Sequence, residues 1–99
     1  MEQLRFEFDA SETLARRAQV GVVGSGNLEV LMEPAVAGKA TVDVTTSQDG
    51  NGEIWSCVLQ RFFEAHPVCA AVEINDFGAT PGVVTLRLMQ AWEACAHED

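Results

Sequence analysis

The chain has 99 residues and carries 15 Asp and Glu against six Lys and Arg, which gives a formal net charge of −9. This length is typical of one domain, so we expect residues 1–99 to form a single domain, too small for a two-domain enzyme with a closing cleft. The acidic excess argues against nucleic acid and anionic membranes as partners, because both attract basic surfaces.

The first half of the chain has the period-two pattern of β-strands. Leu4, Phe6 and Phe8 alternate with Arg5 and Glu7, which predicts a strand with one buried face. By the same reasoning we expect further strands over residues 19–23, 28–33 and 39–46, followed by a turn-rich loop over residues 47–52.

The second half has mainly the 3.6-residue period of helices. A helix is predicted over Glu53–Ala65, with an apolar side formed by Ile54, Trp55, Val58, Leu59, Phe62 and Phe63. Next come a short strand over residues 72–75, a loop over residues 76–81 and a helix that begins at Pro81. The apolar stripe of that last helix is predicted to contain Val84, Leu88, Ala91, Trp92 and Cys95. The order predicts an α+β fold, mainly an antiparallel sheet of about five strands with two helices packed on one face.

A glycine-rich segment, residues 20–30, is the most distinctive part of the chain. Its glycine order differs from that of a dinucleotide fingerprint, and no Lys follows as in a Walker loop. The residues Gly24-Ser25-Gly26-Asn27 instead favour a hairpin turn. Such a turn would hold the Ser25 hydroxyl at an exposed tip, where another enzyme could reach it.

Two histidines and a polar loop are further candidates. His66 precedes Pro67 at the expected end of a helix, where a histidine commonly contacts terminal carbonyls. A hydrolase triad of Ser25, His66 and an Asp is the other hypothesis for this residue. His97 is a weaker candidate. The segment Asn75–Gly82 is either a plain strand-to-helix connection or a contact surface for a partner or prosthetic group.

Cysteine usage and hydropathy bear on location. Cys57, Cys69 and Cys95 are an odd number with no Cys-x-x-Cys pair, so we expect reduced thiols in a cytoplasmic protein and no metal site. Cys57 is expected on the polar side of its helix, and Cys95 in the core. No apolar run reaches the ~20 residues of a transmembrane helix, so membrane insertion is not expected.

Three segments together resemble a known family. Residues 1–6, 20–30 and 73–84 resemble the acyl carrier (delta) subunits of malonate decarboxylases, and more distantly the carrier subunit of citrate lyase. The resemblance covers almost the whole chain. It implies that Ser25 is joined covalently to 2'-(5''-phosphoribosyl)-3'-dephospho-CoA, whose thiol carries acetyl and malonyl groups. The Asp-Ser-Leu motif of helical acyl carriers is absent, and Asn27 stands where some relatives have an acidic residue.

The same resemblance implies a carrier without catalytic residues of its own. Its partners would be the transferase (alpha) and decarboxylase (beta and gamma) subunits and the transferase that installs the prosthetic group. The alternative is a structural or regulatory interaction domain that uses residues 24–27 only as a turn.

Overall fold

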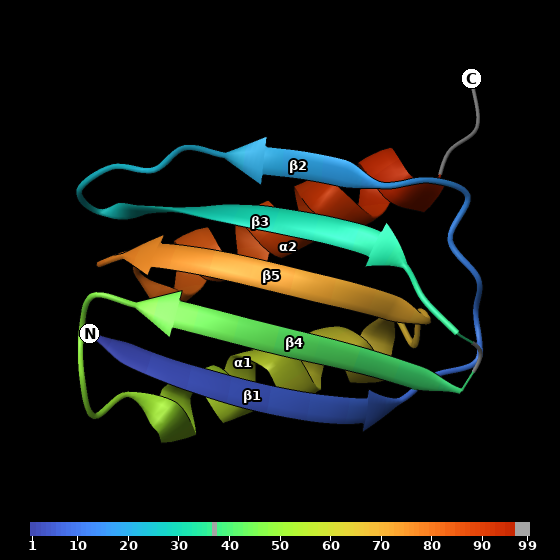
Figure 1. The fold of residues 1–99 in the computed structure, drawn as a ribbon, viewed down its shortest axis with the longest axis horizontal. Helices are drawn as coiled ribbons and strands as arrows, with labels where there is room; N and C mark the ends of the chain where they lie inside the picture. Colours follow the sequence, from blue (N-terminus) through green and yellow to red (C-terminus); the bar gives the residue numbers. More distant parts are fainter. Residues whose placement is uncertain (37, 97–99) are drawn as a thin grey trace.

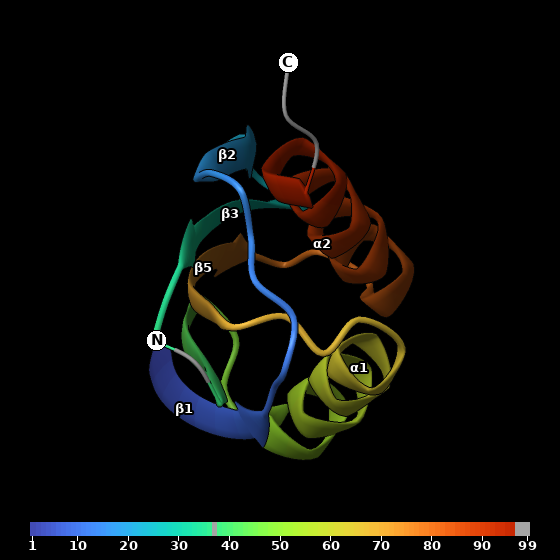
Figure 2. The ribbon, with the colours of Figure 1, turned by 90° about the vertical axis from the view of Figure 1, so that its right-hand side faces the viewer.

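A computed structural model of the protein describes residues 1–36 and 38–96 (Figure 1). The elements follow the order β1 (Glu2–Asp9), β2 (Ala18–Gly21), β3 (Asn27–Pro34), β4 (Lys39–Thr46), α1 (Gly52–Ala65), β5 (Ala70–Phe77) and α2 (Pro81–Ala96). Both helices cover the same face of a five-stranded sheet (Figure 2), which confirms the predicted α+β class. His97 lies outside the described residues.

The sheet is mixed. Its strand order is β1-β4-β5-β3-β2, and the pairings of β1 with β4, β3 with β5 and β2 with β3 are antiparallel. The pairing of β4 with β5 is parallel, because α1 crosses over the sheet between these two strands. The mainly antiparallel character is confirmed, and the central pair is its exception.

The boundaries of β2 differ from the prediction. A strand over residues 19–23 was expected because Val22 and Val23 continue the apolar run, but β2 ends at Gly21, which has a φ of +85°. A Cβ atom on Gly21 would overlap the carbonyl oxygen of Leu28, so only glycine fits this crossing point. The chain leaves the ladder there, and Val22 and Val23 are 59% and 60% exposed.

β5 is longer than the predicted strand over residues 72–75. It runs from Ala70 to Phe77, because β3 and β4 pair with it on both sides along nearly its whole length. Asp76 and Phe77 therefore belong to a strand, and not to the loop in which the local turn chemistry had placed them.

The core lies between the sheet and the two helices. Its most deeply buried side chains include Leu28, Val30, Met32, Val42, Val44, Leu59, Ile74 and Leu88. Trp55 and Cys95 are buried as predicted, and Cys57 is exposed as predicted. Ile54 was predicted to face the core but is 51% exposed, because it lies in the first turn of α1, where it lines a surface cavity.

A connector over residues 10–17 joins the two edge strands, β1 and β2, by crossing one end of the molecule (Figure 2). The amides of Ser11 and Glu12 donate to the carbonyl oxygen of Pro67, just before β5, and the amide of Ala15 donates to that of Cys95 at the end of α2. The connector's own Leu14 side chain is buried in the core. The connector therefore closes the end of the core at which β5 begins.

Cys95 gives the protein a predicted alkaline sensitivity. Burial raises the pKa of its thiol above the ordinary value of 9.0, outweighing the lowering effects of a hydrogen bond with the Ala18 backbone and the charge of Arg16. The unfolded chain therefore ionises this thiol at a lower pH than the folded protein. The thiol's contribution is fully present below pH 9.0 and is lost as the pH rises through the folded pKa.

We expect ionisation of the Cys95 thiol in the unfolded chain to lower the free energy of unfolding above pH 9.0, by up to about 1.4 kcal/mol per pH unit. Urea denaturation of the wild type and Cys95→Val, over a series of pH values on both sides of the ordinary thiol pKa, measures the effect. The variant should show a shallower decline, and equal declines in both proteins would refute the prediction.

Candidate functional site

Ser25 lies at the corner of a β-turn between β2 and β3. The amide of Asn27 donates to the carbonyl oxygen of Gly24 at 3.0 Å, which closes the turn predicted from the sequence. Gly26 has a φ of +74°, the conformation that the third residue of a type II turn requires. Ser25 is exposed, and a Cβ atom on Gly24 or Gly26 would meet nothing within 4 Å. The Ser25 side chain therefore has open space on both sides.

The turn is fastened to the end of β5. The amide of Gly26 donates to the carbonyl oxygen of Phe77 at 2.7 Å, and Asn27 forms a bridge with Gly78. The segment Asn75–Gly82 thus lies directly beside the Ser25 turn, a proximity that the sequence spacing left open. These backbone contacts hold the base of the turn while its tip stays exposed.

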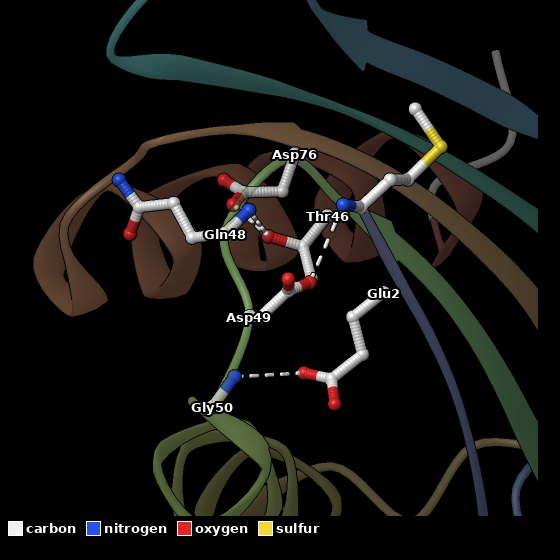
Figure 3. Close-up of polar contacts among 7 residues, drawn as sticks. Glu2, Thr46, Gln48, Asp49, Gly50 and Asp76 are labelled. Atoms are coloured by element: carbon white, nitrogen blue, oxygen red, sulfur yellow. Dashed lines mark hydrogen bonds and ion pairs between the residues drawn. The ribbon is translucent and has the colours of Figure 1, made fainter.

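Asp76 organises the loop beneath the turn. Its carboxylate is buried, with the residue 4% exposed, and it accepts hydrogen bonds from the Thr46 hydroxyl at 2.8 Å, the Gly78 amide at 3.3 Å and the Ala79 amide at 3.0 Å. The side chains of Asp76 and Thr46 point toward each other from neighbouring strands (Figure 3). The three donors compensate the charge of the carboxylate and fix the start of the β5–α2 loop.

A second loop, residues 47–51, follows β4. Figure 3 shows its residues Asp49 and Gly50 beside the start of the N-terminal strand. The Gly50 amide donates to a carboxylate oxygen of Glu2 at 3.2 Å, and the Asp49 carboxylate lies 3.3 Å from the Met1 amino group. The Gln48 amide donates to the Thr46 hydroxyl oxygen at 3.2 Å. The two loops together form the rim of one end of the molecule.

A cavity of about 260 Å³ opens between these loops and the first turns of the two helices. Its apolar lining comes from Ile54, Trp55, Val58, Ala79, Pro81 and Val84, and its polar lining includes Gln48 and Asn51. Gly78 lies between the cavity and the Ser25 turn. A Cβ atom at this position would lie 3.3 Å from Gln48 Nε2, which lines the cavity, and 3.9 Å from the Gly26 amide nitrogen, which belongs to the turn.

Arg87 on α2 reaches the Ser25 turn as well. Its Nε donates to Asn27 Oδ1 at 3.3 Å, and its Nη1 donates to Gln90 Oε1 at 2.9 Å. The sequence placed Arg87 outside the apolar stripe of its helix but gave no signal that joined it to Asn27. The contact spans 60 positions of the chain and depends on how α2 packs on β3.

His66 lies far from Ser25. It lies between α1 and the first residue of β5, whereas the Ser25 turn contacts the last residue of β5. The eight residues of β5 span about 23 Å. Figure 1 shows that this strand runs across the sheet, so its two ends lie at opposite sides of the molecule. The His66 ring packs against Trp92 with a centroid separation of 4.1 Å. A triad of Ser25, His66 and an Asp is therefore not assembled in this fold.

The described residues contain no group of three or more His, Cys, Asp or Glu side chains placed to hold a metal ion. Within the same residues, neither helix is long and apolar enough to cross a membrane. Cys57, Cys69 and Cys95 are all free thiols.

Comparison with known proteins gives one consistent result. Residues 15–95 match the sequence model of the malonate decarboxylase delta subunit family. The malonate decarboxylase acyl carrier protein of Azotobacter vinelandii is 54% identical over 98% of this chain and 99% of its own length. That of Pseudomonas fluorescens is 50% identical over 99% of this chain and its full length.

A solved structure has the same fold. A chain in the crystal structure of a Pseudomonas malonate decarboxylase hetero-tetramer in complex with malonate superimposes with a TM-score of 0.92 and is 48% identical in sequence. The match covers 96% of this chain and 99% of that one.

Proposed function

This chain belongs to the malonate decarboxylase acyl carrier (delta subunit) family, and on that premise we propose that Ser25 carries covalently attached 2'-(5''-phosphoribosyl)-3'-dephospho-CoA. The observation that carries the proposal is the exposed Ser25 side chain at the corner of a turn that backbone hydrogen bonds hold in place. The absence of side chains on Gly24 and Gly26 leaves room for a bulky group at Ser25 Oγ.

The attachment is a phosphoryl transfer in which the chain supplies the nucleophile. Ser25 Oγ loses its proton and forms a bond to the α-phosphorus of a triphosphoribosyl-dephospho-CoA precursor, and pyrophosphate leaves. The described residues around Ser25 expose the hydroxyl, and His66 lies beyond the other end of β5, so the installing transferase provides the base. This division of labour fits a carrier better than an enzyme.

The bound group supplies a terminal thiol that holds acetyl or malonyl as a thioester, which stabilises the negative charge that develops on the α-carbon when carbon dioxide leaves. The chain itself contributes a fixed attachment point. One covalent arm then presents its acyl group to several active sites at a high effective concentration. On this reading the chain is a non-catalytic subunit whose residues 1–99 act as a single carrier domain in the cytoplasm.

The partners of the carrier are, on this proposal, the transferase (alpha) and decarboxylase (beta and gamma) subunits and the transferase that installs the group. The relative of known structure belongs to a hetero-tetramer, which supports a multisubunit assembly. A net charge of −9 favours fast and salt-sensitive encounters with basic surfaces of these partners.

Mass spectrometry tests the attachment directly. We expect the carrier purified from its native host as part of an active complex to be heavier than its sequence by the mass of one prosthetic group, and the added mass to map to the peptide that contains Ser25. The carrier expressed without the installing transferase is the matched control and should have the unmodified mass. An active native complex whose Ser25 is unmodified would contradict the proposal and favour the interaction-domain alternative.

A further inference from the structure

We propose that Arg87 binds the phosphate that links the prosthetic group to Ser25, and so orients the base of the arm. The inference rests on the proposed function, because it assigns a role to a residue beside the proposed attachment site. The attachment site predicted from the sequence consists of the turn alone, and Arg87 would add to it a residue of α2 that contacts the prosthetic group.

The position of Arg87 is set by its contact with the turn. Its Nε donates to Asn27 Oδ1, and the same oxygen accepts the Leu28 amide at 2.8 Å, so Asn27 is held from two sides. Asn27 is two residues from Ser25, a separation of at most about 7 Å between Cα atoms. The Asn27 contact therefore places the Arg87 guanidinium beside the turn whose corner residue is proposed to carry the phosphate.

The charge of Arg87 is not used by any carboxylate among residues 1–36 and 38–96. Its two hydrogen-bond acceptors, Asn27 Oδ1 and Gln90 Oε1, are neutral amide oxygens. Arg5 and Lys39, in contrast, pair with Asp43 and Asp9. A guanidinium has five N–H donors in a planar fork that suits phosphate oxygens, and the two bonds of Arg87 use only part of this capacity.

The other charges of the chain leave Arg87 as the arginine that contacts the turn among the described residues. A phosphodiester adds negative charge to a molecule whose net charge is already −9. Arg16 and Arg17 precede β2, at the end of that strand opposite the turn, whereas Arg61 lies on α1. Arg87 is half-buried on α2, where partial removal from water strengthens an ion pair relative to one in bulk solvent.

Nuclear magnetic resonance of the isolated, loaded carrier tests the proposal without any decarboxylase activity. We expect loading of Ser25 to shift the Nε–Hε resonance of Arg87 and not that of Arg61. We expect Arg87→Gln to shift the ³¹P resonance of the phosphodiester, and Arg87→Lys to shift it less. The matched control Arg61→Gln, with the same change of charge on an exposed position of α1, should leave the ³¹P resonance unchanged.

The rate of loading by the installing transferase provides a second measurement. Arg87→Gln should lower this rate roughly fivefold, the upper range for a partly exposed ion pair, and Arg61→Gln should change it less than twofold, on the order of a surface substitution. Added salt should narrow the difference between wild type and Arg87→Gln, because the contact is electrostatic.

Asn27→Ala separates phosphate binding from mere support of the turn, since it removes the Asn27 contact but keeps the Arg87 charge. We expect a smaller ³¹P shift than for Arg87→Gln. An equal shift would mean that Arg87 acts only by holding the turn, and would overturn the proposal. So would a fully loaded Ser25 with unchanged resonances in Arg87→Gln. A chain that is never loaded at Ser25 would instead overturn the proposed function, and this inference with it.

Discussion

Replacement of Ser25 by alanine should abolish both the covalent adduct and the malonate decarboxylase activity of the reconstituted complex. Alanine has no hydroxyl, so no phosphodiester can form and no acyl group can be carried. The fold should be unaffected, with a change in unfolding free energy within about 0.5 kcal/mol, because the Ser25 side chain is exposed. Intact mass, turnover of malonate and urea denaturation measure the three outcomes.

Ser47→Ala is the matched control for this experiment. Ser47 is an exposed serine in the loop after β4, and its backbone amide donates to the Asp76 carbonyl oxygen at 3.0 Å. We expect normal loading and full activity. Retained activity in Ser25→Ala would eliminate the carrier role and leave an interaction domain.

Removal of the Asp76 carboxylate should have the largest effect on stability. Asp76→Ala leaves the buried Thr46 hydroxyl and the partly buried Gly78 and Ala79 amides without their acceptor. Unsatisfied buried donors cost about 1–3 kcal/mol each, and partial solvation of the loop reduces the sum, so we expect a loss of roughly 3 kcal/mol. Urea denaturation should show a lower midpoint for the variant.

Two further variants sharpen this prediction. Asp76→Asn keeps the shape and one acceptor oxygen but turns an amide group toward one of the donors, so its loss should be intermediate. Asp43→Ala removes an exposed carboxylate that pairs with Arg5 at 3.0 Å, and should cost less than about 1 kcal/mol. A cost for Asp76→Ala no greater than for Asp43→Ala would show that the buried network contributes little.

The elements that the sequence predicted best are those whose pattern is local and complete. The alternation from Lys39 to Thr46 predicted β4 with its observed bounds, and the predicted helix over 53–65 begins one residue after α1 does. The parallel pairing of β4 with β5 has no local signal, since it depends on which strand lies beside which after α1 crosses the sheet. The longer β5 likewise follows from two neighbouring strands.

In the candidate site, too, the features with a local sequence pattern were predictable and the long-range contacts were not. Gly24, Gly26 and Asn27 have turn chemistry, and the turn that exposes Ser25 was predictable from them. The contacts of Asp76 with Thr46 and of Arg87 with Asn27 join positions 30 and 60 residues apart, and only the packed fold brings them together. The contact between the Asn75–Gly82 segment and the Ser25 turn is likewise a long-range contact that the sequence did not predict.

The hydrogen bond from the Gly26 amide to the Phe77 carbonyl has a geometric consequence for the assembly. It makes the base of the proposed arm a pivot that moves with the central strand of the sheet and not with a loose hairpin. The thiol at the far end then sweeps a shell whose radius is set by the arm alone. Every active site that the carrier serves must open within one arm length of that pivot, unless the whole carrier shifts on its partners.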